Sequence, residues 1–81
     1  VLHNAVCREH IIMKVGNGPA SRQPVIEIAN LFRAKVVNVA ESRLMLELTG
    51  EPEKIDSFIG LLQPYGVKEI VRTGISALER D

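Results

Sequence analysis

The amino-acid sequence predicts an α+β fold, a two-layer sandwich in which two helices cover one face of a four-stranded antiparallel sheet. Two patterns support this prediction. Short aliphatic runs with alternating or β-branched residues recur along the chain, and two longer segments repeat apolar residues at the spacing of one helix face. Their order is βαββαβ, which is the order of the split-βαβ, ferredoxin-like sandwich. Right-handed crossovers then place both helices on the same face of the sheet.

The first strand is expected at Arg8–Val15, where aliphatic residues dominate. Its apolar residues fall on both faces, with Ile12 opposite to Ile11 and Met13, and this suits a central strand better than an exposed edge. The turn-forming residues 16–19 then break the strand.

The first helix is expected at Ser21–Phe32. Ser21 can accept a hydrogen bond from a first-turn N–H, and Pro24 is tolerated there because its missing donor has no helical partner. One apolar stripe follows the helical repeat and consists of Val25, Ile28, Ala29 and Phe32.

Two further strands, Lys35–Ala40 and Leu44–Thr49, are separated by a short polar connection and should form an antiparallel hairpin. The second of them alternates cleanly, which places Met45 on the face opposite to Leu44 and Leu46.

The second helix is expected from Pro52 to Leu62, and Pro64 and Gly66 end it. The last strand is expected at Val67–Arg72. Residues 1–7 are then a lead-in and residues 75–81 a partly apolar tail, so that 1–81 forms one domain with one uncovered sheet face.

Composition excludes several classes of protein. The chain has 81 residues, enough for one domain, and its ten basic and ten acidic residues cancel. Without a net positive charge, and without aromatic residues on the expected central strands, it does not resemble a nucleic-acid-binding module. No apolar run is long enough to cross a membrane. The single cysteine, Cys7, excludes an intrachain disulfide within these residues.

A metal site is disfavoured. His3, Cys7 and His10 would share one face of a helix, but the adjoining residues indicate a strand, on which His10 points away from the other two. Catalysis is also disfavoured, because both histidines lie near the amino end and no Gly-x-Ser-x-Gly elbow surrounds any of the four serines.

Two regions are candidate binding surfaces. Asn17, Gly18 and Ser21 lie before the first helix and could receive a carboxylate at its positive end, although a plain strand-to-helix turn is the favoured interpretation. The uncovered sheet face is the second region and is expected to meet another subunit. The expected subunit-contact residues are Ile12, Met45, Arg72 and Arg80.

Three stretches resemble the C-terminal domain of the small, regulatory subunit of acetolactate (acetohydroxyacid) synthase. The first is the strand Arg8–Val15, the second contains FRAKVVNV at 32–39, and the third contains LTGEPEKI at 48–55 and PYGVKEIVRTG at 64–74. Asn38, His10 and the pair Gln23 and Pro24 depart from the pattern of the family.

This resemblance implies an ACT-like, ferredoxin-like domain with no catalytic, cofactor or metal residue of its own. It implies a dimer, in the cytoplasm or a plastid stroma, that associates with a catalytic large subunit using thiamine diphosphate, Mg²⁺ and FAD. That enzyme is expected to condense two pyruvates, or pyruvate with 2-oxobutyrate, in branched-chain amino-acid synthesis. The small subunit is expected to raise its activity and to confer feedback inhibition, commonly by valine. The effector is expected on an ACT domain that precedes this region. The alternatives are a stand-alone amino-acid sensor and a metal-responsive regulator of similar build.

Overall fold

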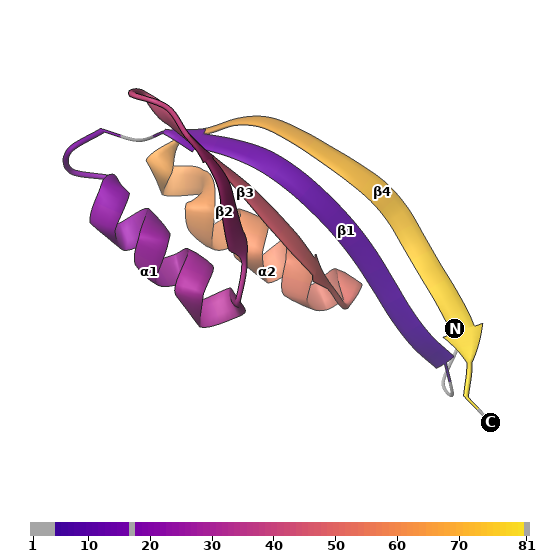
Figure 1. Cartoon of the computed structure of the whole chain (residues 1–81). Helices are drawn as coiled ribbons and strands as arrows, with labels where there is room; N and C mark the ends of the chain where they lie inside the picture. Colours follow the sequence, from indigo (N-terminus) through magenta and orange to yellow (C-terminus); the bar gives the residue numbers. More distant parts are fainter. Residues whose placement is uncertain (1–4, 17, 81) are drawn as a thin grey trace.

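The structure is a computed structural model that describes residues 5–16 and 18–80. Its elements follow the expected βαββαβ order (Figure 1). They are β1 (Ala5–Gly16), α1 (Arg22–Phe32), β2 (Lys35–Val39), β3 (Arg43–Gly50), α2 (Pro52–Leu62), a 3₁₀ turn (Gln63–Tyr65) and β4 (Val67–Glu79).

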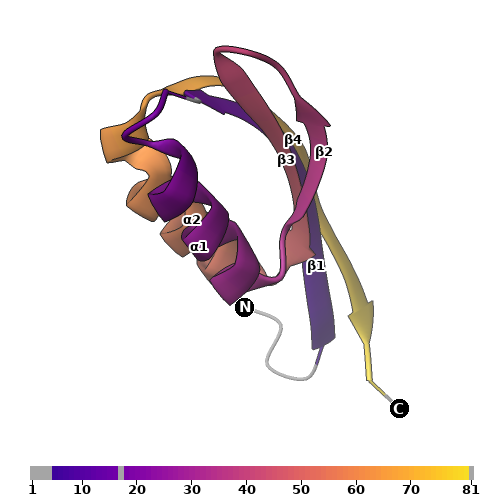
Figure 2. The same ribbon diagram turned by 60° about the vertical axis from the view of Figure 1, so that its left-hand side comes forward.

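The sheet has the order β2-β3-β1-β4, and each neighbouring pair is antiparallel. β1 and β3 are therefore central, as predicted from their apolar content. Both helices lie on one side of the curved sheet, and no described helix covers the other side (Figure 2). The predicted ferredoxin-like sandwich is confirmed.

The core lies between the sheet and the helices. Alternate residues of β1 and β3 face inward, and they meet the apolar stripes of α1 and α2. Phe32 and Phe58 close the space between the helices, with ring centroids 5.2 Å apart and planes inclined by 54°. The buried apolar residues are Ile11, Met13, Val15, Val25, Ala29, Leu44, Leu46, Leu48, Ile55, Phe58 and Leu62.

The start of α1 differs from the prediction in one detail. The Ser21 side chain makes no capping hydrogen bond, because the backbone of Ser21 is already in the right-handed helical region rather than the extended region of a capping residue. The carbonyl of Gly18 instead accepts the N–H groups of Ser21 and Arg22, each at 3.0 Å. A tight backbone turn thus begins the helix.

The last strand is much longer than predicted. We expected it to end at Arg72, but it continues to Glu79, and β1 begins at Ala5 rather than Arg8. Gly74, which lies just after the predicted end of this strand, adopts a positive φ of 82° at an irregularity in the pairing of β1 with β4. A glycine there allows a β-bulge, after which pairing resumes.

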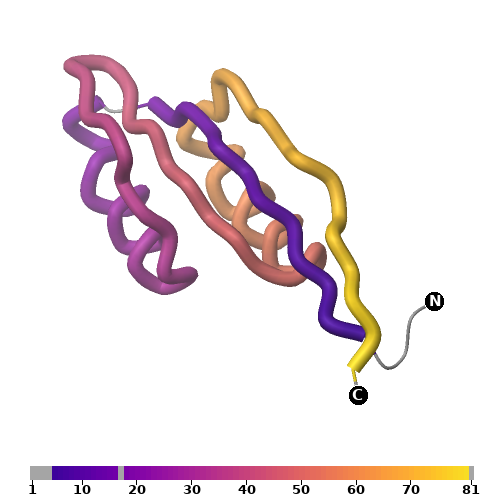
Figure 3. Tube along the Cα trace, turned by 45° about the vertical axis from the view of Figure 1, so that its right-hand side comes forward, coloured from indigo at the N-terminus to yellow at the C-terminus, as the bar shows by residue number. Residues whose placement is uncertain are grey.

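Residues 5–9 and 75–79 form a ribbon that projects beyond the helices, and it is two-stranded beyond Glu9, where β3 ends (Figure 3). We call these paired segments the ribbon. They make the molecule elongated, with a longest extent of 47 Å against 18 and 17 Å in the other two directions. The segment predicted to be a tail is therefore part of the sheet.

Candidate subunit interface

The open face of the sheet is built by the residues that alternate with the core positions. Ile12 lies on this face between Val71 of β4 and Glu47 of β3, and it is 36% exposed. Met45 of β3 is half-buried and lies opposite Lys14 in the strand register. The predicted placement of Ile12 and Met45 on the uncovered face is confirmed, whereas their role as subunit contacts stays a prediction.

Charged residues flank this apolar centre. Nζ of Lys14 lies 3.6 Å from a carboxylate oxygen of Glu69, and a guanidinium nitrogen of Arg43 lies 3.9 Å from its other oxygen. On β1 and β3, Nε2 of His10 lies 2.8 Å from a carboxylate oxygen of Glu47. An apolar centre with a paired, polar periphery is the usual composition of a protein–protein contact.

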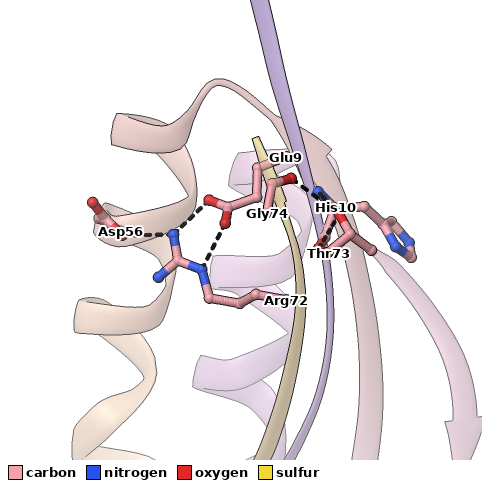
Figure 4. A network of polar contacts seen from close by, with 6 residues as sticks. All are labelled: Glu9, His10, Asp56, Arg72, Thr73 and Gly74. Atoms are coloured by element: carbon pink, nitrogen blue, oxygen red, sulfur yellow. Dashed lines mark hydrogen bonds and ion pairs between the residues drawn. The ribbon is translucent and has the colours of Figure 1, made fainter. Parts of the chain in front are cut away.

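Arg72 does not present its charged group to the open face. Its guanidinium turns toward the helices, where it donates to both carboxylate oxygens of Glu9 at 2.9 and 2.5 Å and to Asp56 of α2 at 3.1 Å (Figure 4). The hydrogen bond with Glu9 raises the pKa of Arg72 above its ordinary value. The group thus stays cationic and joins β1, β4 and α2. We call these three residues the clasp.

Glu9 is the one charged residue in the inward phase of β1, and it is only 5% exposed. We did not predict this buried carboxylate from the sequence. A signal was available, because Glu9 falls two residues before Ile11 in the alternation that buries Ile11, Met13 and Val15. A carboxylate in that phase requires a hydrogen-bonding cation.

The clasp lies where the ribbon leaves the helices. Thr73 follows Arg72, and its Oγ1 accepts the N–H of His10 at 3.2 Å and donates to the carbonyl of His10 at 3.3 Å (Figure 4). Thr73 therefore remains bonded to β1 although the regular pairing is interrupted there.

The ribbon carries exposed apolar side chains. Ile75 is 61% exposed and Leu78 is 78% exposed. A hollow of about 440 Å³ lies on it, lined by Val6, Arg8, Ser76, Ala77, Leu78 and Glu79. Arg80 follows the ribbon and is exposed. Of the predicted contact residues, Arg80 is thus available on the surface, and Arg72 is engaged by the clasp.

The turn before α1 is the second predicted site. Asn17 lies outside the described residues. Gly18 lines a hollow of about 570 Å³ that also includes residues after β2, and its lining residues are Gly18, Pro19, Arg22, Glu41 and Ser42. Ser21 is half-buried beside it and does not line it. The structure thus brings Gly18 together with Arg22 and with the β2–β3 connection, a combination that the sequence did not predict.

The predicted arrangement of possible metal ligands can be followed in part. Cys7 and His10 belong to opposite faces of β1, in agreement with the strand interpretation, and His3 lies outside the described residues. Among residues 5–16 and 18–80, no three side chains of His, Cys, Asp or Glu form a group that could hold a metal ion. No helix in the same part of the chain is long and apolar enough to cross a membrane.

Comparison with known proteins gives a consistent result. A family model described as the small subunit of acetolactate synthase matches residues 8–81. The chain is 43% identical over 77 residues to the acetolactate synthase small subunit of Mycolicibacterium smegmatis, covering 95% of this chain and 45% of that protein. It is 44% identical over 75 residues to that of Bacillus subtilis, covering 93% of this chain and 44% of that protein.

A solved structure shares the fold as well. The small subunit of acetolactate synthase from Thermotoga maritima superposes with a TM-score of 0.89 at 36% identity, over 95% of this chain and 47% of that chain. This chain spans about half the length of the relatives it matches. The resemblance that the sequence indicated is confirmed, and the chain belongs to the family of acetolactate synthase small subunits.

Proposed function

We propose that this chain is a non-catalytic regulatory module that helps to activate acetolactate synthase and transmits feedback inhibition by branched-chain amino acids, commonly valine, to the catalytic subunit. The observation that carries the proposal is the match of residues 8–81 to the small-subunit family. The proposed partners are the catalytic large subunit and a second small subunit, in the cytoplasm or a plastid stroma. Thiamine diphosphate, Mg²⁺ and FAD are assigned to the large subunit.

The structure supports this role because it exposes two surfaces suited to contacts with other subunits. The open sheet face has an apolar centre at Ile12 and Val71 with ion pairs around it, and the ribbon adds a projecting apolar surface. Both surfaces belong to one continuous sheet, whose strands β1 and β4 run through the face and the ribbon alike. A partner held by the ribbon is therefore mechanically connected to a partner held by the face.

Regulation through such a module requires differential binding. An effector on a preceding ACT domain shifts the assembly only if it binds one arrangement of subunits more tightly than the other. Coupling free energies of this kind are about 1–3 kcal/mol, which a modest contact can carry. The proposed contacts are Ile12 and Met45 on the face and Arg80 after the ribbon.

The test is reconstitution of the catalytic subunit with the complete small subunit and with a small subunit lacking the domain formed by residues 5–80. We expect the shortened subunit to lose activation, the valine response, or both. A second variant, Ile12→Lys, places a charge at the centre of the open face, and Gln63→Lys, an exposed position at the end of α2, is its matched control. Unchanged activation and unchanged valine inhibition in both the shortened and the Ile12→Lys subunits would refute the proposal.

The second candidate is a stand-alone amino-acid sensor, and the hollow beside Gly18 and Arg22 favours it. A guanidinium and the start of a helix suit a carboxylate. Calorimetric titration of the chain with valine, leucine and isoleucine distinguishes the candidates. Saturable heat that disappears in an Arg22→Gln variant supports the sensor, and the absence of heat supports the transmitting module.

A further inference from the structure

The pairing of β1 with β4 is interrupted at the root of the ribbon. His10 has no regular partner in the described register of these two strands. Its backbone is held by the Thr73 hydroxyl instead, which accepts the His10 N–H at 3.2 Å and donates to the His10 carbonyl at 3.3 Å. β3 also ends here, with Gly50 opposite Glu9. Side-chain contacts therefore carry a larger share of the anchoring at this point than along a regular ladder.

We propose that the hydrogen-bonded pair of His10 and Glu47 is a pH-sensitive brace, which anchors the root of the ribbon more firmly at weakly acidic than at weakly alkaline pH. Nε2 of His10 on β1 lies 2.8 Å from a carboxylate oxygen of Glu47 on β3, and the two side chains are 31% and 34% exposed. We call this pair the brace. The inference goes beyond the proposed function, because it concerns order within one chain and holds whichever partner the ribbon contacts.

The brace and the clasp hold the root of the ribbon from opposite sides of the sheet. The clasp lies on the helix side, and the His10 imidazole points away from it (Figure 4). An arginine is not deprotonated in proteins, so the cation of the clasp is constant. An imidazole, in contrast, gains or loses its charge between about pH 5 and 8. The brace is therefore the contact at this point whose strength depends on pH.

The geometry determines which nitrogen of the imidazole titrates. An ionised carboxylate can only accept hydrogen bonds, so the His10 Nε2 that faces Glu47 carries a hydrogen in both charge states. Nδ1 is then the nitrogen that gains or loses the proton. With Nδ1 protonated, the contact is an ion pair with a charge-assisted hydrogen bond, and such bonds are roughly twice as strong as neutral ones. With Nδ1 unprotonated, a hydrogen bond from a neutral donor remains.

The charged groups around the brace determine the sign of the effect. Lys35 lies opposite Glu47 in the register of β2 with β3, and Arg33 lines the same hollow as that carboxylate. Arg8 lies two positions before His10, on the same side of β1, and the nearest open-side residues of β4 are uncharged. Cations disfavour a further positive charge nearby, so Glu47 is the group that favours the imidazolium. Lysine, arginine and glutamate side chains generally keep their charges between about pH 5.5 and 8, which leaves His10 as the titrating group.

A firmer root increases the order of the surface that the ribbon presents. Ile75 and Leu78 are exposed there, and the hollow of about 440 Å³ lies beside Leu78. Two-stranded segments are marginally stable in water, so a small change in anchoring alters how often the ribbon opens. The protonated brace should therefore hold this apolar surface in place, and the ribbon should open more often as the pH rises and the imidazolium loses its proton.

The test is amide exchange of the complete small subunit at about pH 5.5 and about pH 8, with each rate corrected for its intrinsic pH dependence. Relative to the amides of α1, residues 75–79 should be protected roughly 1.5- to five-fold more at the lower pH, the range for one partly exposed ion pair. His10→Gln keeps a hydrogen-bonding side chain without a titrating group and should abolish this difference. Lys35→Gln is the matched control, because it changes a charge beside Glu47 and should preserve the difference.

An NMR titration of the His10 imidazole is the second measurement, and it tests the brace even if His10→Gln does not fold. Glu47→Gln removes the carboxylate and should move the titration midpoint to lower pH by about 0.2–0.7 pH units. Three results would overturn the brace. They are equal protection of residues 75–79 at both pH values, a pH difference that persists in His10→Gln, and a midpoint that Glu47→Gln leaves unchanged. None of these measurements involves the catalytic subunit, so this inference and the proposed function fail separately.

Discussion

Arg72 on β4 and Glu9 on β1 form a two-bond ion pair at the point where the ribbon leaves the helices, with nitrogen–oxygen distances of 2.9 and 2.5 Å. Glu9 is buried, and Asp56 of α2 binds the same guanidinium at 3.1 Å. The Arg72 guanidinium therefore connects both strands to α2.

Removing one member of this pair should destabilise the fold more than removing both. Arg72→Leu leaves the Glu9 carboxylate buried without its cation, whereas Glu9→Leu with Arg72→Leu replaces the pair by apolar side chains. We expect the midpoint of urea unfolding to fall most for Arg72→Leu and to recover in part in the double variant. Asp56→Ala, which removes the exposed partner, is the control and should change the midpoint least. Equal midpoints for Arg72→Leu and Asp56→Ala would contradict the structure.

The coupling between Glu9 and Arg72 should not change in mild alkali. Hydrogen bonding to Glu9 raises the pKa of Arg72 above its ordinary value. Because this pKa is higher in the folded than in the unfolded state, the protonated guanidinium stabilises the fold fully below the unfolded pKa. That stability is lost only as the pH rises through the folded pKa, which is far above neutrality. A double-mutant cycle should therefore give the same coupling at about pH 7 and about pH 9, because arginine is protonated at both. A smaller coupling at the higher pH would refute this prediction.

Phe58 should be essential to stability. Its side chain is fully buried and packs against Phe32 of α1 with the two rings tilted. Phe58→Ala removes that contact and leaves a cavity, and the expected loss is about 3–5 kcal/mol in the free energy of unfolding. Leu61→Ala in the same helix is the control, since Leu61 is 48% exposed and should lose about 1 kcal/mol or less. Calorimetric melting of both variants measures the difference.

Replacing Gly16 or Gly60 by alanine should change the free energy of unfolding in opposite directions. A Cβ added at Gly16 would lie 2.8 Å from the Tyr65 carbonyl oxygen, and the Gly16 N–H donates to the carbonyl of Gly66 at 3.0 Å. Gly16→Ala should therefore cost about 1–3 kcal/mol. At Gly60, inside α2, an added Cβ meets no atom within 4 Å. Gly60→Ala should stabilise the chain by about 0.5–1 kcal/mol, as alanine generally does in a helix. Denaturant unfolding tests both signs.

Gly74 should control the ribbon specifically. Its φ of 82° is unfavourable for any residue with a Cβ, so Gly74→Ala should cost about 1–2 kcal/mol locally. We expect faster amide exchange in residues 5–9 and 75–79 and little change in α1. Gly18→Ala, where an added Cβ meets no atom within 4 Å, is the matched control. Uniformly faster amide exchange across the whole chain would show that Gly74 does not stabilise the ribbon specifically.

Local patterns predicted most of the fold. The alternation in β1 and β3 and the apolar stripes of α1 and α2 depend on neighbours in the sequence, so they identify the elements and the buried faces. The open-face positions of Ile12 and Met45 follow from the same alternation.

The ribbon and the clasp could not be predicted in this way. From the sequence, Gly74 can either end the strand or form a β-bulge. Only the pairing of β1 with β4 distinguishes the two, because it shows whether the backbone groups after Gly74 are hydrogen-bonded. Arg72 and Glu9 are 63 positions apart, and their contact depends on the register of two strands. The predicted side-chain cap at Ser21 was wrong because the Gly18 carbonyl accepts the N–H groups of the first turn, which the sequence pattern did not indicate.

The pairing of Ala5 with Glu79 brings both ends of the described chain to one tip of the ribbon. A force that pulls those ends apart acts across the strands and loads their hydrogen bonds one pair at a time, as in opening a zipper. β1 and β4 should thus separate at low force from the tip inward, until the load reaches Glu9 and Arg72. The ion pair is then the first point of mechanical resistance, and it shields the helices from tension transmitted along the chain.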